Sequence, residues 1–267
     1  MEHDNLLEGR IDDLSRRAYN NDYLTCTNFL SASDIASFYR ILKGRGISSK
    51  VNALNGSTYV IYGGHEDADR NVICFLPSYT TPEEFIVSEA AAGDIIKCIH
   101  VKPLNNKFAD ELSHRDFLGA LMNLGIEREQ IGDILVDGSS AYIFVLSDMA
   151  DTVARELTRV KHTSVNCRVV SPKECDVQPK FTEISGSVAS QRVDAVLAMV
   201  WHLSRGRSQE VIKAENVFIN GQTVTDPGYN LKPGDRVTVR GHGKFIFEGT
   251  GTMTKKGRFY ANVRVYS

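Results

Sequence analysis

The sequence contains no long hydrophobic run. Its apolar runs are only a few residues long, as at 72–76 and 142–146, whereas a helix that crosses a membrane needs about 20. Residues 1–13 are acidic and polar and do not resemble a secretory signal. These absences predict a cytoplasmic protein without membrane contact. With 42% hydrophobic residues, the chain has enough apolar side chains to form ordinary cores.

Cysteine is also scarce. The five cysteines contain no C-x-x-C motif and no Cys/His spacing of the kind that holds a metal. An odd number of cysteines without close pairs is typical of reduced thiols in a reducing compartment. We therefore expect free thiols, no metal site and no other cofactor.

Net charge is nearly absent as well, at −2, but it is unevenly distributed. Residues 186–267 contain 12 Lys and Arg against 6 Asp and Glu, whereas the rest of the chain contains 19 against 27. A basic module attached to an acidic body indicates a polyanionic partner at one end of the chain.

The first segment, residues 1–80, is predicted to be a mixed helix and strand domain. Residues 5–19 have apolar side chains at helical spacing, and Ser33 is a candidate N-cap for a second helix through Lys43. The pair Asn55-Gly56 separates two strand-like runs and predicts a hairpin, followed by a strand at 72–76. The Pro-containing stretch 77–82 is the first expected boundary.

The second segment, residues 81–178, has the predicted order β-α-β-β-α-β, with strands at 95–101, 132–136, 141–146 and 165–170 and helices at 113–124 and 149–160. This is the ferredoxin-like order, which RNA-recognition domains share, although order alone does not imply RNA binding. Tyr142 and Phe144 lie on one face of a strand and either stack on bases or pack against the protein. Residues 171–186 are predicted to be a linker.

The third segment, residues 186–267, begins with two predicted helices and ends in strands. The first, 191–202, has one apolar stripe, and Ser204 is the expected N-cap of the second, which runs to Ala214. A strand at 217–219, the turn Asn220-Gly221, and a strand in which Val237 and Val239 point inward follow. The whole chain is thus assigned to the α+β class.

Basic residues are placed at the starts of these two helices. Arg192 opens the first, Arg205 and Arg207 lie in the first turn of the second, and Lys213 ends it. Guanidinium groups bind phosphate through paired hydrogen bonds, and a helix start favours anions. The candidate RNA-binding residues are these four together with Asp194, which we expect to orient an arginine, and the polar side chains of Ser204, Ser208 and Asn220.

The run from Arg192-Val193-Asp194 through Ser204-Arg205, Val211-Ile212, Asn220-Gly221 and Lys232-Pro233-Gly234-Asp235 resembles the S-four RNA-binding domain, named after the fourth small-subunit ribosomal protein. With the order of segments before it, the chain resembles the YlmH family of bacterial proteins. The resemblance implies a non-enzymatic protein that binds structured RNA and acts on obstructed translation. The implied partners are large-subunit ribosomal RNA and, as a further candidate, tRNA on the ribosome.

The alternative is an RNA-modifying or tRNA-related enzyme that uses the S-four domain as its RNA anchor. The sequence lacks the ATP-binding signatures of tyrosyl-tRNA synthetases, and too few residues follow the S-four resemblance, which ends near residue 248, for a catalytic domain of the pseudouridine-synthase kind. The loop with His65, Glu66, Asp67 and Asp69 could hold a metal in principle, but a solvated loop is the preferred interpretation. We therefore predict no catalytic residue and no small-molecule substrate.

Overall fold

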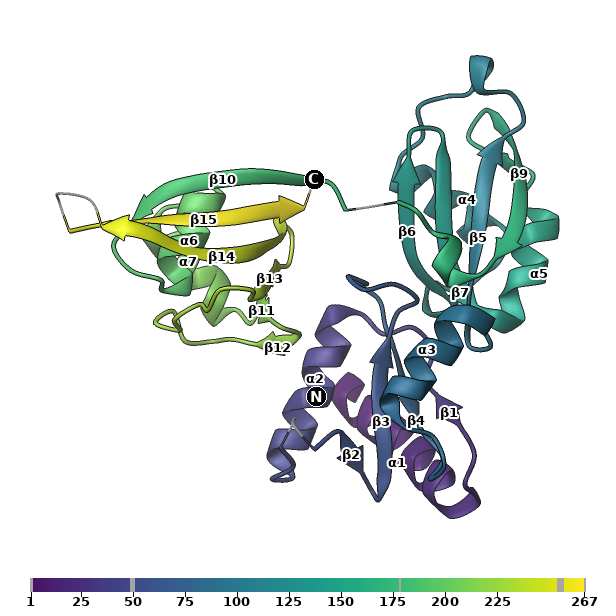
Figure 1. Cartoon of the computed structure of the whole chain (residues 1–267), viewed down its shortest axis with the longest axis horizontal. Coiled ribbons are helices and arrows are strands. Elements are labelled where there is room, and N and C mark those ends of the chain that lie inside the picture. The colour runs from purple at the N-terminus through teal and green to yellow at the C-terminus, as the bar shows by residue number, and fades with distance from the viewer. Residues whose placement is uncertain (1, 49–50, 178, 254–256, 267) are drawn as a thin grey trace. The chain divides into compact units, whose positions relative to one another are not determined.

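The computed structural model describes residues 2–48, 51–177, 179–253 and 257–266 (Figure 1). The chain forms two compact units, residues 1–177 and 178–267. Both contain helices and sheets, which confirms the α+β class. None of the helices in the described residues is long and apolar enough to span a bilayer.

The first part of the first unit is a four-stranded antiparallel sheet, in the order β1-β4-β3-β2, packed against two helices. Its elements are α1 Glu2–Asn21, β1 Thr25–Cys26, α2 Ala32–Gly44, β2 Ala53–Leu54, β3 Ser57–Tyr62 and β4 Val72–Phe75. The predicted hairpin over Asn55 and Gly56 is confirmed, with positive φ angles of 50° and 87° at the two residues. Positive φ at both central residues is the requirement that favours Asn-Gly in a two-residue hairpin turn.

Two local predictions in this part are wrong. Helix α2 is capped by Ser31, whose Oγ accepts a hydrogen bond from the backbone N–H of Asp34, while the Asp34 carboxylate accepts one from the N–H of Ser31. This reciprocal pair is a capping box, which Ser33 cannot form with Asp34 at the required spacing of three residues. Cys26 and Cys74 face each other across the β1–β4 ladder and form a disulfide, where free thiols were expected.

The second part has the predicted β-α-β-β-α-β order. It consists of β5 Ile96–Pro103, α4 His114–Asn123, β6 Ile131–Asp137, β7 Ser140–Leu146, α5 Ser147–Glu156 and β9 Thr163–Val170, with the short strand β8 Arg159–Val160 before β9. The sheet order is β6-β7-β5-β9-β8. Helix α5 ends four residues earlier than predicted, because the chain turns into β8. A helix at α3 Pro82–Ala92, begun by a Thr81–Glu84 capping box, was not predicted.

The face of this sheet that lies away from α4 and α5 is covered by the first part of the chain. Tyr142 is 6% exposed and Phe144 is fully buried, and they share one apolar cluster with Phe29, Val60 and Val72. Of the two interpretations of the aromatic pair, the structure shows the packed sheet face. These rings are therefore not available for stacking on RNA bases in this arrangement.

The acidic loop between β3 and β4 is anchored to strand β6 by hydrogen bonds to Asp133. The Asp133 carboxylate on β6 accepts hydrogen bonds from the backbone N–H groups of Asp69 and Arg70, at 2.7 and 3.1 Å, and lies 3.0 Å from His65 Nε2. Glu66 and Asp69 are exposed and His65 and Asp67 are half-buried, so the stretch is a solvated loop, as predicted, that Asp133 anchors at its base. Within the described ranges, no group of three or more His, Cys, Asp or Glu residues is arranged to hold a metal ion.

The second unit is a six-stranded antiparallel sheet, in the order β10-β15-β14-β13-β11-β12, with two helices on one face. Its elements are β10 Phe181–Val188, α6 Val193–Val200, α7 Arg205–Lys213, β11 Val217–Ile219, β12 Gln222–Thr223, β13 Arg236–Val239, β14 Gly243–Met253 and β15 Phe259–Tyr266. The linker prediction is wrong from residue 181 onward, because β10 pairs with β15 along its full length. Val237 and Val239 are buried, as predicted.

Candidate nucleic-acid interface

Helices α6 and α7 present their first turns to the same small region of the second unit. The buried stripe of α6 and the buried pair Val211 and Ile212 on α7 hold both helices on the sheet. Helix α7 begins where predicted, because the Ser204 side chain accepts a hydrogen bond from the backbone N–H of Arg207 at 3.2 Å. This packing fixes the backbone from which the arginines extend.

Asp194 lies between the two helix starts and is fully buried. Its carboxylate accepts hydrogen bonds from Arg192 Nε and Nη2 at 3.1 and 2.9 Å, from Arg205 Nε at 3.3 Å and from Gln209 Nε2 at 3.1 Å. The arginine side chains are themselves 37% and 64% exposed. One buried carboxylate thus holds two guanidinium groups at the surface.

The electrostatics of this cluster keep Asp194 ionised. Burial alone would raise the pKa of Asp194, but hydrogen bonds from Arg192 and Gln209 and the charge of Arg192 outweigh it, so that the pKa lies below its usual value. In turn, the hydrogen bond to Asp194 raises the pKa of Arg192. The cluster is therefore a fixed arrangement of one negative and two positive charges at neutral pH.

The remaining basic candidates lie on the outer side of α7. Arg207 is exposed and forms an ion pair with Glu210, from Nη1 to Oε2 at 2.9 Å. Lys213 is exposed in the last turn of the same helix. Exposed pairs of this kind contribute little to stability, so Arg207 can exchange its partner at small cost.

Two of the polar candidates have internal roles instead. Ser208 is fully buried, and its hydroxyl donates to the backbone carbonyl of Ser204 at 3.2 Å. Asn220 has a φ of 50° and bridges two residues, donating to Asp235 Oδ1 and accepting from the N–H of Arg236. The Ser208 side chain thus stabilises the first turn of α7, and the Asn220 side chain stabilises the turn between β11 and β12.

Gln209 is the member of the cluster that sequence reasoning missed. It lies four residues after Arg205 on α7, so the two side chains share one face of the helix and can reach the same acceptor. That spacing, together with an acid expected to orient an arginine, is the signal from which it could have been found.

Comparison with known proteins assigns this fold to a family. A family model described as "Putative RNA-binding domain in YlmH" matches residues 95–174, and a model of the S4 domain matches residues 191–237. The chain is 31% identical over 201 residues to the ribosome-associated protein quality control protein P2 of Bacillus subtilis, and the match covers 74% of each chain. The chain belongs to the YlmH family.

Two further similarities concern parts of the molecule. Small ribosomal subunit protein uS4 of Dictyoglomus turgidum is 37% identical over 46 residues, 17% of this chain and 22% of that protein. The structure of the cell division protein YlmH from Streptococcus pneumoniae matches with a TM-score of 0.47 and 20% identity, over 65% of this chain and 94% of that one. In this YlmH family member, the S4 match contains the whole Asp194 cluster, whereas β10 and β15 lie outside it.

Proposed function

We propose that the chain is a non-enzymatic RNA-binding protein whose second unit binds structured RNA through Arg192, Arg205 and Arg207, with Lys213 in support. The observation that carries this proposal is the Asp194 cluster, in which a buried carboxylate holds two guanidinium groups at the surface. Arginines fixed in this way lose less conformational freedom when they bind phosphate, so more of the contact energy contributes to affinity.

The guanidinium groups, rather than the helix starts, are the main phosphate ligands in this proposal. The first backbone N–H groups of α6 donate to the carbonyls of Tyr229 and Pro227, at 2.8 and 3.3 Å, and the N–H of Arg207 in α7 donates to Ser204. These donors are already used within the protein. The positive end of each helix still adds a favourable potential for an anion.

The class of RNA is proposed from the relatives. The Bacillus subtilis relative is named as a ribosome-associated quality control protein, and the S4 domain occurs in a ribosomal protein. These names support RNA of the ribosome as the target. Within that class we propose large-subunit ribosomal RNA as the ligand, tRNA on the ribosome as a second candidate partner and obstructed translation as the process. A cytoplasmic location follows from such a role.

The double substitution Arg205→Ala with Arg207→Ala tests the proposal. Ribosome co-sedimentation of the full chain should be abolished, because two phosphate contacts and their counterion release disappear. On an isolated structured RNA, the slope of log affinity against log salt should fall by about one unit for each phosphate that is no longer neutralised. Both side chains are more than half exposed, so circular dichroism should show an intact fold.

The matched control is Arg16→Ala with Arg17→Ala in α1, which removes the same charge from two adjacent exposed arginines of the first unit. It should leave co-sedimentation and the salt slope unchanged. Full retention of the Arg205/Arg207 variant on large subunits would contradict the proposed site, and an equal reduction in both variants would indicate nonspecific attraction by charge.

A further inference from the structure

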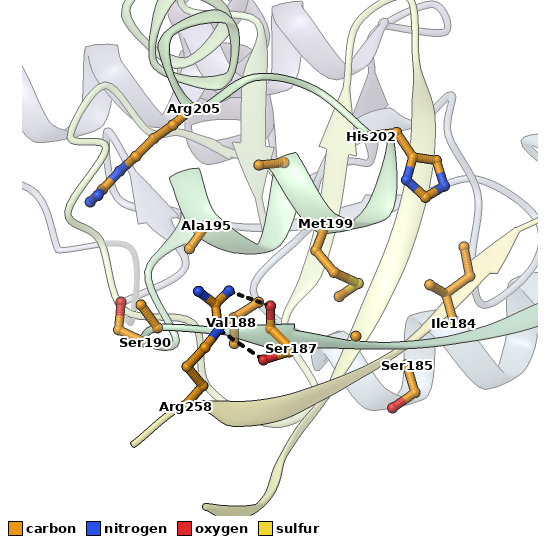
Figure 2. A pocket seen from close by; sticks show the side chains of 13 residues that line it. Ile184, Ser185, Ser187, Val188, Ser190, Ala195, Met199, His202, Arg205 and Arg258 are labelled. Carbon is orange, nitrogen blue, oxygen red and sulfur yellow. Dashed lines mark hydrogen bonds between the residues drawn. The ribbon is translucent and has the colours of Figure 1, made fainter. Parts of the chain in front are cut away.

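A groove runs along the second unit between the edge strand β10 and helix α6, with a volume of about 460 Å³ (Figure 2). Its α6 side is formed by the small side chains of Ala195 and Ala198 and by Met199, which points toward the strand. Its other side is β10 from Ile184 to Val188. The volume lies in the range of small-molecule sites.

The backbone of β10 approaches α6 closely at one point. A Cβ atom at Gly186 would lie 2.5 Å from Met199 Cγ, so any larger residue there would force the Met199 side chain to move. β10 is an edge strand of the sheet: among the described residues, it pairs with β15 along one edge and with no strand along the other. An edge strand presents backbone donors and acceptors to whatever occupies the groove beside it.

The charged side chains that border the groove are basic. These are the arginines: Arg205 lies at the end near Ser190, and Arg258 lies along β10, where it donates to the hydroxyl and carbonyl of Ser187 (Figure 2). The imidazole of His202 lies at the other end, near Ile184. Among the described residues that line the groove, none is acidic. The groove therefore combines an apolar floor with a cationic border, which suits an aromatic ligand that carries negative charge.

Arg205 connects the groove to the Asp194 cluster, because its Nε donates to Asp194 while its side chain lines the groove. A phosphate bound by this arginine therefore lies at the mouth of the groove. A base adjoining that phosphate can reach Met199, whose flexible thioether packs well against aromatic rings. A nucleobase can also stack on a guanidinium plane and bond to backbone groups through its edges.

We propose that this groove binds one unpaired nucleotide of the RNA that the arginine cluster holds. The inference rests on the proposed RNA binding and adds to it a preference for RNA in which a nucleotide is extruded from the helix. The groove is built from parts of the chain outside the S4 match, namely 184–190 and Arg258, packed on an S4 helix.

The test compares two RNA hairpins with the same stem, one fully paired and one with a single bulged 4-thiouridine, binding to the full chain. The bulged hairpin should bind about tenfold more tightly, because the unpaired base gains stacking contacts in the groove. Ultraviolet crosslinking followed by mass spectrometry should attach the thiouridine to residues 184–190 or 195–202. Equal affinities, with crosslinks elsewhere, would overturn the groove assignment and leave RNA binding itself intact. Binding to neither hairpin would overturn the proposed function as well.

Two variants sharpen the comparison. Ala198→Leu narrows the groove and should abolish the preference for the bulge without changing affinity for the paired stem. Arg258→Gln, at an exposed position, should reduce the preference even if Ala198→Leu disturbs folding. The control Arg240→Gln removes an exposed charge from the same unit away from the groove and should affect both hairpins equally. A preference unchanged in both groove variants would contradict the inference.

Discussion

At the scale of single residues, Asp194 combines two requirements that usually conflict. A carboxylate beside a phosphate-binding surface repels the ligand, but here it is fully buried and shielded by the side chains of Arg192, Arg205 and Gln209. Its negative charge is compensated locally, and the arginines retain exposed N–H groups for the ligand. In the proposed function, Asp194 therefore acts on the RNA only by orienting its arginine partners.

Asp194→Asn should weaken RNA binding by about tenfold, or ~1.4 kcal/mol, although it makes the unit more positive. The amide N–H₂ would face the donors of Arg192 or Gln209, and the guanidinium groups would no longer have a fixed orientation. Glu248→Gln is the matched control, because it adds the same charge at an exposed position paired with Arg264 on the sheet. Fluorescence anisotropy with a structured RNA measures both variants, and tighter binding by Asp194→Asn would show that orienting the arginines is not the role of this residue.

The effect of Asp194→Asn on the free energy of unfolding should depend on pH. Because the pKa of Asp194 is lowered in the folded unit, the ionised carboxylate stabilises the fold above the unfolded pKa of about 3.9, and this contribution disappears as the pH falls through the folded pKa. The wild-type advantage in the free energy of unfolding, ~1–3 kcal/mol at pH 7, should shrink below about pH 4. Urea titrations at pH 7, 4 and 3 measure it, and a difference independent of pH would contradict the assignment.

The sequence predicted the charged residues of the site better than its polar ones. Arg192, Asp194 and Arg205 are brought together as expected, because helix spacing and a shared apolar stripe determine where they lie. The burial of Ser208 and the bridging role of Asn220 depend on how α7 and the β11–β12 turn pack against other elements. That tertiary information is not contained in local spacing.

At the scale of elements, helix α7, which carries two of the proposed RNA-binding arginines, contains one residue that lowers its stability. Gly206 lies in its first turn with helical backbone geometry, and a Cβ atom there would have no neighbour within 4 Å. Glycine lowers helix stability by ~1 kcal/mol relative to alanine because it loses more backbone entropy on folding. Nothing in the packing of the described residues requires this glycine.

Gly206→Ala should therefore raise the free energy of unfolding of the second unit by ~0.5–1 kcal/mol, with RNA affinity unchanged or slightly improved. Gly234→Ala provides the contrast: it also has open space around it, but its φ of 89° is unfavourable for alanine, so it should destabilise by about 1 kcal/mol. Urea unfolding of the two variants and the wild type measures these changes in the free energy of unfolding. Stabilisation by both would show that backbone conformation is not the determining factor.

Elements whose sequence signals are local could be predicted, whereas an element that depends on a distant partner could not. The Asn55-Gly56 hairpin and the β-α-β-β-α-β order have local signals and were found. Strand β10 was missed because its partner, β15, is distant in the sequence and its own segment is rich in small polar residues. Helix α3 had a local signal that was overlooked, since Thr81, Pro82 and Glu84 form a capping box with proline at the first helical position.

At the scale of the whole molecule, each apolar cluster lies within one of the two units. In the described part of the chain, three clusters are formed within residues 1–177 and one within residues 178–267. The first two sequence segments share a cluster between their sheets, to which Phe29 and Tyr62 belong together with Phe144 and Cys98. We therefore expect the two units to unfold separately, and the first two segments to unfold together.

Limited trypsin digestion should cut early after Lys180, an exposed residue at the start of the second unit. The products should be two fragments that each retain helix and sheet signals in circular dichroism, because the cut interrupts no apolar cluster of the described residues. The variant Lys180→Gln should slow the appearance of both fragments. Separation of residues 1–80 from 81–177 as two independently folded pieces would contradict the shared cluster.

The pairing of β10 with β15 also determines when the second unit can finish folding during synthesis. Strand β10 precedes the S4 match and pairs only with β15 among the described residues, and β15 follows the match. As a chain emerges from the ribosome, the first unit can fold early, since domains generally fold in the order in which they are made. The β10 wall of the groove, however, can be completed only after residues 259–266 have been made. A nascent chain that has exposed α6 and α7 thus carries its arginines before it has the complete groove beside them.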